Sequence, residues 1–236
     1  MGVVQEELRA DICAHAEQEY PRESCGLVVI RKGRQRYVPI KNIADHNEHF
    51  VMSAEDQVMA EDMGEVVAVV HSHPNLPPIP SQADLVGCER SGLPWLIVNW
   101  PTGVMYEFKP TGYKPPLYGR QFAHGVLDCY TWIQAYYGET LAIVLPDFVH
   151  QDEWWLKGQN LYLEGFESAG FVQVDTPQQH DGLLMRMGSP VPNHGAVFLG
   201  DGCIGHHHMG RLSSRDVYGG WYEKITTHIL RHKSLM

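Results

Sequence analysis

The chain has 236 residues, of which 44% are hydrophobic and 19% are charged, and it carries a formal net charge of −10. This composition predicts one large or two ordinary globular domains, and the acidic balance argues against a nucleic-acid partner. No apolar run approaches the roughly 20 residues of a membrane-spanning helix, and the polar, acidic start lacks the features of a signal peptide. Five cysteines without a CxxC pair indicate free thiols rather than a cysteine zinc knuckle.

The first half of the chain alternates segments with helix and strand patterns. A helix is expected over 3–19, where apolar residues recur every four positions, and others over 53–63 and 81–92, the last with Ser81 at its cap. Strands are predicted over 26–30, 35–40, 65–73, 93–100 and 103–110. The strand at 65–73 is a continuous apolar run, which indicates burial on both faces. This alternation predicts an α/β domain.

A proline- and glycine-rich segment, KPTGYKPPLYGR, follows at 109–120. Such a composition is typical of a linker between domains. We therefore predict a first domain over residues 1–112, a linker over 113–118 and a second domain over 119–236.

The second half begins with a predicted helix over 128–137, and helical patterns follow near 152–169. Short strands are then expected over 171–175, 183–187, 194–200, 203–207 and 225–232. A short helix is predicted around 216–222, before the last of these strands. Helices followed by strands are typical of an α+β domain.

The first candidate site lies in the stretch HSHPNLPPIPSQAD, which begins at the end of the apolar strand. His71 and His73 point to the same face of that strand, and two imidazoles on one face suit a divalent transition metal, zinc above all. Asp84 would be a third ligand, and an open fourth position is typical of catalytic zinc. Glu23 is a candidate general base, and Ser81 is a candidate donor to an oxyanion. The alternative is a strand end followed by an S-x-x-D helix cap.

The spacing H-x-H, seven residues, S, two residues, D, with an upstream Glu before Cys-Gly, resembles the JAMM motif of the Mov34/MPN (JAB) metalloproteases. The resemblance covers about residues 1–110 and includes the order of strands and helices. It implies a cytidine-deaminase-like layered sheet with helices, one zinc ion held by His71, His73 and Asp84, and Glu23 as the acid/base. The family hydrolyses amide and isopeptide bonds, which is the activity that the resemblance implies here.

The second candidate site combines Cys129 with histidines near the C-terminus. Cys129 begins a predicted helix, whose positive N-terminal partial charge favours a thiolate nucleophile. His194 opens one predicted strand and His206 lies at the end of the next, so a short turn at GDG brings both imidazoles to one layer. His194 could then deprotonate Cys129 while His206 orients its ring. The alternatives are a buried structural cysteine and exposed or weakly metal-binding histidines, and His207 and His208 compete with His206 for the third position.

The pattern DCxxW, followed by HGAVFLGDG and a second histidine twelve residues after the first, resembles the NlpC/P60 cysteine peptidases. The resemblance covers the second predicted domain and implies a papain-like α+β fold with a triad of Cys129, His194 and His206. It also implies cleavage of bacterial cell-wall stem peptides, commonly next to D-glutamate. Members often have a tyrosine upstream of the cysteine, a stretch in which this chain has Tyr118 and Phe122.

A JAMM domain followed by an NlpC/P60 domain, with the ending WYEKITTHILRHK, resembles the tail-tip assembly proteins of siphophages. This resemblance implies a component of the virion tail tip that is made in the host cytoplasm, with other tail-tip proteins as partners and peptidoglycan peptides as substrate. The alternative is a structural docking or assembly factor whose hydrolase folds need no catalysis. A cellular wall-remodelling peptidase is disfavoured, because a chain without an export signal cannot reach the wall unaided.

Overall fold

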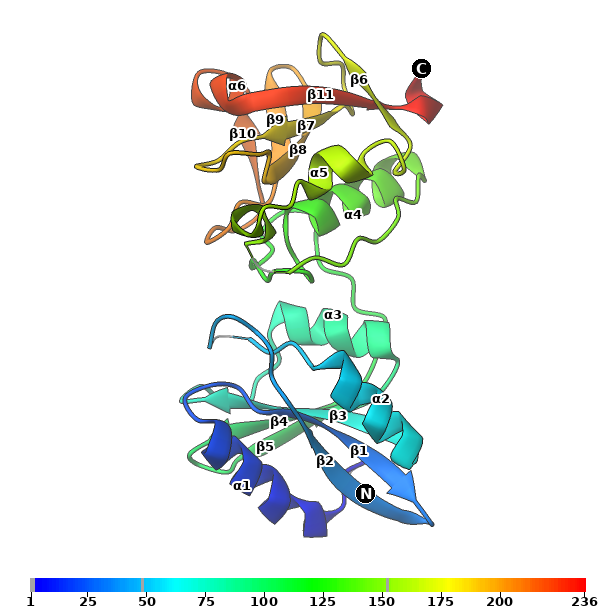
Figure 1. The fold of residues 1–236 in the computed structure, drawn as a ribbon, viewed down its shortest axis with the longest axis vertical. Helices are drawn as coiled ribbons and strands as arrows, with labels where there is room; N and C mark the ends of the chain where they lie inside the picture. The colour runs from blue at the N-terminus through cyan, green and yellow to red at the C-terminus, as the bar shows by residue number, and fades with distance from the viewer. Residues whose placement is uncertain (1–2, 48, 152) are drawn as a thin grey trace. The chain divides into compact units, whose positions relative to one another are not determined.

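The computed structural model describes residues 3–47, 49–151 and 153–236 (Figure 1). The chain forms two compact units, an N-terminal unit of Met1–Lys114 and a C-terminal unit of Pro115–Met236. The boundary between the units falls inside the segment for which a linker is predicted. Among the described residues, every helix is too short or too polar to cross a membrane.

A five-stranded mixed sheet forms the centre of the N-terminal unit. Its strands are β1 (Cys25–Arg31), β2 (Arg34–Ile40), β3 (Glu65–Pro74), β4 (Trp95–Trp100) and β5 (Met105–Phe108). They lie in the order β2-β1-β3-β4-β5, and every neighbouring pair is antiparallel except β3 and β4. A parallel pair needs a crossover connection, and the chain between β3 and β4 provides one that contains a helix. The strands predicted for this half are confirmed, with ends shifted by a few residues.

Helices cover both faces of this sheet (Figure 1). They are α1 (Arg9–Glu19), α2 (Ala54–Met63) and α3 (Gln82–Ser91), with a short 3-10 helix, η1 (Glu6–Leu8), before α1. α1 packs on one face, where Ala68 and Val70 of β3 contribute to its core. α2 and α3 pack on the other face, to which Val69 points. Because side chains alternate along a strand, His71 and His73 also point to the face that α3 covers.

The first helix begins later than predicted, at Glu6 as a 3-10 turn and at Arg9 as an α-helix. Val3 and Val4 are held outside it, because their backbone N–H groups donate to the carboxylate of Glu107. Val4 nevertheless packs in the same core as α1. The four-residue spacing of apolar residues therefore predicts the burial of Val4 correctly, but it places the start of the helix several residues too early.

A six-stranded antiparallel sheet forms the centre of the C-terminal unit, in the order β10-β9-β8-β7-β11-β6. Its strands are β6 (Phe171–Val174), β7 (Gly182–Met185), β8 (His194–Gly200), β9 (Cys203–His206), β10 (Ser214–Val217) and β11 (Thr226–His232). The helices of this unit are α4 (Cys129–Leu141), α5 (Leu161–Gly165) and α6 (Trp221–Ile225), with the 3-10 helices η2 (Trp154–Lys157) and η3 (Lys233–Leu235). The unit is therefore an α+β domain.

Two glycines bring α4 close to the sheet. A Cβ atom at Gly205 of β9 would come within 2.3 Å of the indole of Trp132, which is fully buried. A Cβ atom at Gly195 of β8 would come within 2.7 Å of the side chain of Ile133. Since neither glycine has a side chain, α4 rests directly on the two strands that carry the candidate histidines.

One prediction for this unit is wrong, and another is confirmed only in part. In place of the helix around 216–222, the structure has β10, which pairs with β9, and α6, which begins at Trp221. Tyr218, Gly219 and Gly220 separate the two elements, and Gly220, with a φ of 55°, is the N-cap of α6. The helical pattern near 152–169, whose first position lies outside the described residues, yields only the short η2 and α5.

Candidate functional site

The N-terminal unit brings the three predicted metal ligands together. The Nε2 atom of His71 lies 3.1 Å from Nε2 of His73 and 3.1 Å from Oδ1 of Asp84, and Nε2 of His73 lies 3.4 Å from Oδ2 of Asp84. All three residues are buried. β3 supplies the imidazoles from its C-terminal end, and α3 supplies the carboxylate from its first turn. The rings of Phe50 and Trp95 pack on His71 at 4.8 and 5.5 Å between centroids, which fixes that imidazole.

The donor chemistry of this group fits a transition metal. Nδ1 of His73 donates to the Pro77 carbonyl at 3.0 Å, so Nε2 of the neutral ring carries a lone pair. That lone pair faces the His71 imidazole and the Asp84 carboxylate, and such a convergence of acceptors needs a proton or a cation. The separations of 3.1 to 3.4 Å also suit zinc, because ligands roughly 2.0–2.1 Å from a tetrahedral ion lie about 3.3 Å apart.

Asp84 also completes the N-cap of α3. Ser81 Oγ accepts from the Asp84 N–H at 3.1 Å, and Asp84 Oδ2 accepts from the Ser81 N–H at 2.7 Å. The helix cap and the ligand group therefore coexist, and the cap holds the carboxylate toward β3. Burial disfavours ionisation of Asp84, but the contacts with His71 and His73 outweigh it and hold the pKa of this carboxyl well below its ordinary value.

Glu23 lies beside the same group. The carbonyl of Ser24 accepts from the Ser72 N–H at 3.0 Å, which extends the antiparallel pairing of β1 with β3, and the Ser24 N–H donates to the Ser72 hydroxyl at 2.8 Å. This register carries Glu23 to the level of His73. Burial raises the pKa of the Glu23 carboxyl, against the opposing effect of the imidazoles of His71 and His73. A buried carboxyl with a raised pKa is suited to taking up and returning a proton.

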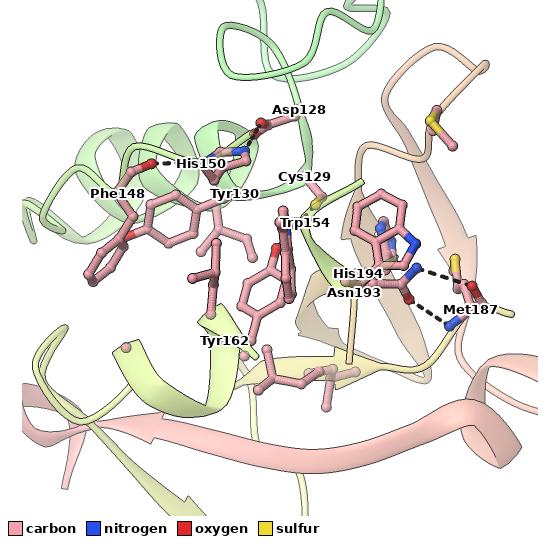
Figure 2. A pocket seen from close by; sticks show the side chains of 18 of the residues that line it. Asp128, Cys129, Tyr130, Phe148, His150, Trp154, Tyr162, Met187, Asn193 and His194 are labelled. Atoms are coloured by element: carbon pink, nitrogen blue, oxygen red, sulfur yellow. Dashed lines mark hydrogen bonds and ion pairs between the residues drawn. The ribbon is translucent and has the colours of Figure 1, made fainter. Parts of the chain in front are cut away.

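The C-terminal unit contains a cavity of about 570 Å³ lined by residues of α4, α5 and the sheet (Figure 2). Cys129, the first residue of α4, and His194, the first residue of β8, both line it. The thiol lies 3.1 Å from the hydroxyl of Tyr162 and is also hydrogen-bonded by the backbone of Gly195. The structure therefore brings the predicted thiol and the first predicted histidine to one cavity.

A line of hydrogen bonds continues behind His194. Nε2 of His194 lies 2.9 Å from Nδ1 of His206, and Nε2 of His206 lies 2.9 Å from Oδ2 of Asp216. The same carboxylate oxygen accepts from the Tyr222 hydroxyl at 3.0 Å. His206 is fully buried, so its ring is held between the other imidazole and the carboxylate.

The three consecutive histidines have different neighbours. His206 makes the hydrogen bond to His194. His207 is buried with its ring 5.3 Å from that of Phe122. His208 lines the cavity, and its ring centroid lies 5.7 Å from that of His194. Its Nδ1 atom lies 2.7 Å from the carbonyl oxygen of Met209. The hydrogen bond therefore favours His206 as the third member of the group.

The surroundings keep the thiol and the imidazole neutral. Burial and the adjacent Asp128 carboxylate raise the pKa of Cys129 to about 11. Burial and the neighbouring His206 lower the pKa of His194 well below its ordinary value. Burial and the carboxylate therefore act against the thiolate that the helix N-terminus is expected to favour.

Two residues of this site, Asp216 and Tyr162, are absent from the sequence-based set. Asp216 is missing from that set because the sequence predicts a helix around 216–222. A strand there, paired with β9, would have placed Asp216 beside the candidate histidines. The resemblance implies a tyrosine upstream of the thiol, in the stretch that holds Tyr118 and Phe122, of which only Tyr118 has a hydroxyl. Phe122 lines the cavity, whereas Tyr118 packs on Trp132, and the tyrosine that contacts the thiol comes from α5 downstream.

Comparisons with known proteins identify the domain that forms the N-terminal unit. Residues 5–110 match the family of prokaryotic homologs of the JAB domain. The chain is also 37% identical over 83 residues to a desampylase of Pyrococcus furiosus, a match that covers 33% of this chain and 59% of that protein. The N-terminal unit is therefore a JAB/MPN domain.

Matches over nearly the whole chain identify its family. The chain is 39% identical over 228 residues to the tail tip assembly protein K of Escherichia phage N15, covering 95% of this chain and 93% of that protein. It is 43% identical over 185 residues to the tail tip assembly protein K of Escherichia phage lambda, covering 78% and 90%. The chain belongs to the tail tip assembly protein K family, which confirms the resemblance drawn from the sequence.

Proposed function

We propose that this protein works in the phage tail tip with other tail-tip proteins. Its C-terminal unit would be an NlpC/P60-type cysteine endopeptidase that cuts peptidoglycan stem peptides during DNA delivery. The observation that supports the peptidase best is the line of hydrogen bonds from His194 through His206 to Asp216, which ends at a cavity that Cys129 also lines. The two phage relatives are called tail tip assembly proteins, which supports the tail tip as the place where this protein acts.

The hydrogen bonds set the protons of the proposed site. Asp216 accepts from Nε2–H of His206, which leaves a lone pair on Nδ1 of that ring. That lone pair accepts from Nε2–H of His194. Nδ1 of His194 is then the unprotonated nitrogen, which is the one that can take the proton of Cys129.

This arrangement supports acyl transfer through the thiol. As the thiol proton passes to His194, the sulfur of Cys129 attacks the peptide carbonyl and forms a thioester, and the imidazolium returns the proton to the leaving amine. Water then hydrolyses the thioester with the same imidazole as base. His206 and Asp216 stabilise the transient imidazolium, the role that an aspartate has in other triads.

The first test is release of muropeptides from purified sacculi, followed by mass spectrometry. Wild type and Cys203→Ala, which removes another partly buried cysteine, are expected to release the same stem-peptide fragments. Cys129→Ala is expected to release none. Equal release by wild type and Cys129→Ala would contradict the proposed nucleophile.

The N-terminal unit would be a zinc-dependent peptidase that acts on amide or isopeptide bonds in wall peptides or in a tail protein. Zinc held by His71, His73 and Asp84 would supply a Lewis acid and lower the pKa of a bound water. Glu23 would take up and return the proton, and the hydroxyl of Ser81, whose oxygen already caps α3, would donate its hydrogen to the developing oxyanion.

This zinc assignment is tested by the metal content of protein loaded with zinc and then passed through a desalting column. Replacing His71 and His73 by alanine is expected to remove one zinc ion per chain relative to wild type. His46→Ala, at an exposed position of the same unit, is the matched control. An unchanged zinc content in the double variant would contradict the site.

One observation favours the alternative, an assembly factor in which catalysis is dispensable. The thiol of Cys129 contacts the hydroxyl of Tyr162, and its pKa is raised to about 11, so the resting site holds little thiolate. Phage carrying Cys129→Ala would distinguish the two functions. Normal assembly and infection would support the assembly factor, whereas assembled but poorly infecting virions would support the peptidase.

A further inference from the structure

A second group of two histidines and one aspartate lines the C-terminal cavity. His124, Asp128 and His150 each offer one ligand atom, and these atoms lie within 4.8 Å of one another. His124 lies in a tight turn closed by hydrogen bonds between Ala123 and Leu127. Asp128 caps α4, and His150 comes from the segment between α4 and η2. Two separate parts of the chain, the turn that leads into α4 and the segment after it, therefore converge on one place.

The contacts of His150 point to a cation there. Its Nδ1 atom lies 2.9 Å from the carbonyl of Phe148, and its Nε2 atom lies 3.0 Å from Oδ2 of Asp128 (Figure 2). Both neighbours are acceptors, while a neutral imidazole carries a single N–H. The Nε2 side therefore needs either an additional proton or a metal ion shared with the carboxylate.

The surroundings favour the metal ion. The His124 ring lies 4.6 Å from the His150 ring, so two imidazoles share one carboxylate, a donor set that suits zinc. The Asp128 side chain is only 3% exposed, and it accepts from the amides of Gly125 and Thr131 at 2.9 Å each. Metal-bound carboxylates and imidazoles are held by outer hydrogen bonds of this kind, as is the His150 ring by its carbonyl partner.

We propose that His124, Asp128 and His150 form a binding site for a divalent transition metal ion, with zinc as the best match to the donor set. The three side chains line the cavity, so the remaining coordination positions face its interior. Asp128 directly precedes Cys129, and an ion at this site places positive charge beside the thiol. The site needs neither the thiol nor the His194 line of hydrogen bonds, so it does not depend on the proposed peptidase activity.

The test is a titration of the chelator-treated full chain with Zn²⁺, and with Co²⁺ for its visible absorption. In a background with His71→Ala and His73→Ala, which removes the N-terminal ligand group, one ion per chain is expected to bind. Adding His150→Ala is expected to weaken binding by about 100-fold. His228→Ala, on β11, is the matched control and is expected to leave the affinity unchanged.

Two more variants separate loss of a ligand from loss of the fold. Asp128→Asn keeps an acceptor for the α4 cap but removes the charge, so binding is expected to weaken while the circular dichroism spectrum is retained. Cys129→Ala is expected to keep the ion. The site would be overturned by a background that binds no ion, by binding that survives both His150→Ala and Asp128→Asn, or by binding lost with the thiol. Stoichiometry and affinity are independent of muropeptide release, so each proposal can fail alone.

Discussion

Both units place histidines at strand ends, but their two sites are completed in different ways. In the N-terminal unit, the carboxylate of Asp84 lies 3.1 to 3.4 Å from both imidazoles. In the C-terminal unit, the thiol of Cys129 lies against the hydroxyl of Tyr162, and the carboxylate of Asp216 reaches His194 only through His206.

This difference in the position of the carboxylate gives the two sites different charges, and therefore different chemistry. A carboxylate in direct contact with two imidazoles forms a negatively charged group that is ready for a cation. A neutral thiol near a neutral imidazole holds no charge until a proton moves, and the distant carboxylate acts on the imidazolium that then forms. The same residue types therefore favour metal binding at the Asp84 group and proton transfer at the site of Cys129 and His194.

The largest expected effect would separate the two sites. His194→Ala removes the proposed base and is expected to lower kcat/KM for muropeptide release by roughly 10²- to 10⁴-fold, with the zinc content unchanged. His73→Ala is expected to do the reverse. Kinetics and metal analysis of both variants provide the measurement, and loss of both properties in either variant would show that the two sites are coupled.

The next prediction tests whether the thiol is neutral at rest. Because the pKa of Cys129 is raised to about 11, its thiolate fraction grows tenfold per pH unit below that value. Alkylation of chelator-treated protein by iodoacetamide is therefore expected to be about 100-fold faster at pH 9 than at pH 7. Peptide mass spectrometry follows Cys129 separately from the other cysteines. A rate that is flat over this range would reveal a thiolate already formed at neutral pH.

The same contrast explains how much of each site the sequence predicts. His71, His73 and Asp84 lie on one strand–loop–helix stretch, so their spacing and the motif suffice to bring them together. Cys129 and His194 lie on elements far apart in the chain. The motif resemblance names them, but neither the raised pKa of the thiol nor its contact with a downstream tyrosine follows from local sequence, because burial decides both.

The elements that the sequence misplaces have a non-local cause. β10 exists because Ser214 and Asp216 pair with β9, and no pattern within the segment itself carries that information. The start of the first helix is displaced by the carboxylate of Glu107, which lies about a hundred residues away in the chain and takes the N–H groups of Val3 and Val4. Local propensity predicts the remaining elements of the N-terminal unit because packing there agrees with it.

A smaller effect tests what holds the C-terminal site together. Gly205→Ala drives a methyl group into Trp132 and is expected to lower the free energy of unfolding by about 1–3 kcal/mol. In α4, the helix that carries Trp132, a Cβ atom at Gly138 meets nothing within 4 Å, so Gly138→Ala is expected to raise the free energy of unfolding by up to about 1 kcal/mol. Urea denaturation of the full chain measures both. Equal stability of the two variants would show that α4 does not depend on the close approach to β9.

The smallest effect concerns the carboxylate behind His206. Asp216→Asn keeps the size and an acceptor but loses the charge that stabilises an imidazolium, so kcat/KM is expected to fall by about tenfold. Ser214→Ala, which removes a weaker contact of 3.5 Å to the same carboxylate, is the matched control. If Asp216 were only structural, the variant would lose stability without a change in the pH profile of kcat.

The carboxylate of Asp84 ties the start of α3 to the end of β3, since one oxygen accepts from Ser81 while the other faces His71. Fraying of the first turn of α3 would therefore carry a ligand away from the imidazoles, and an ion that holds the ligand would hold the turn. Amide hydrogen exchange in this turn would then slow as metal occupancy rises. The rate of exchange would therefore measure metal binding at this site without any substrate.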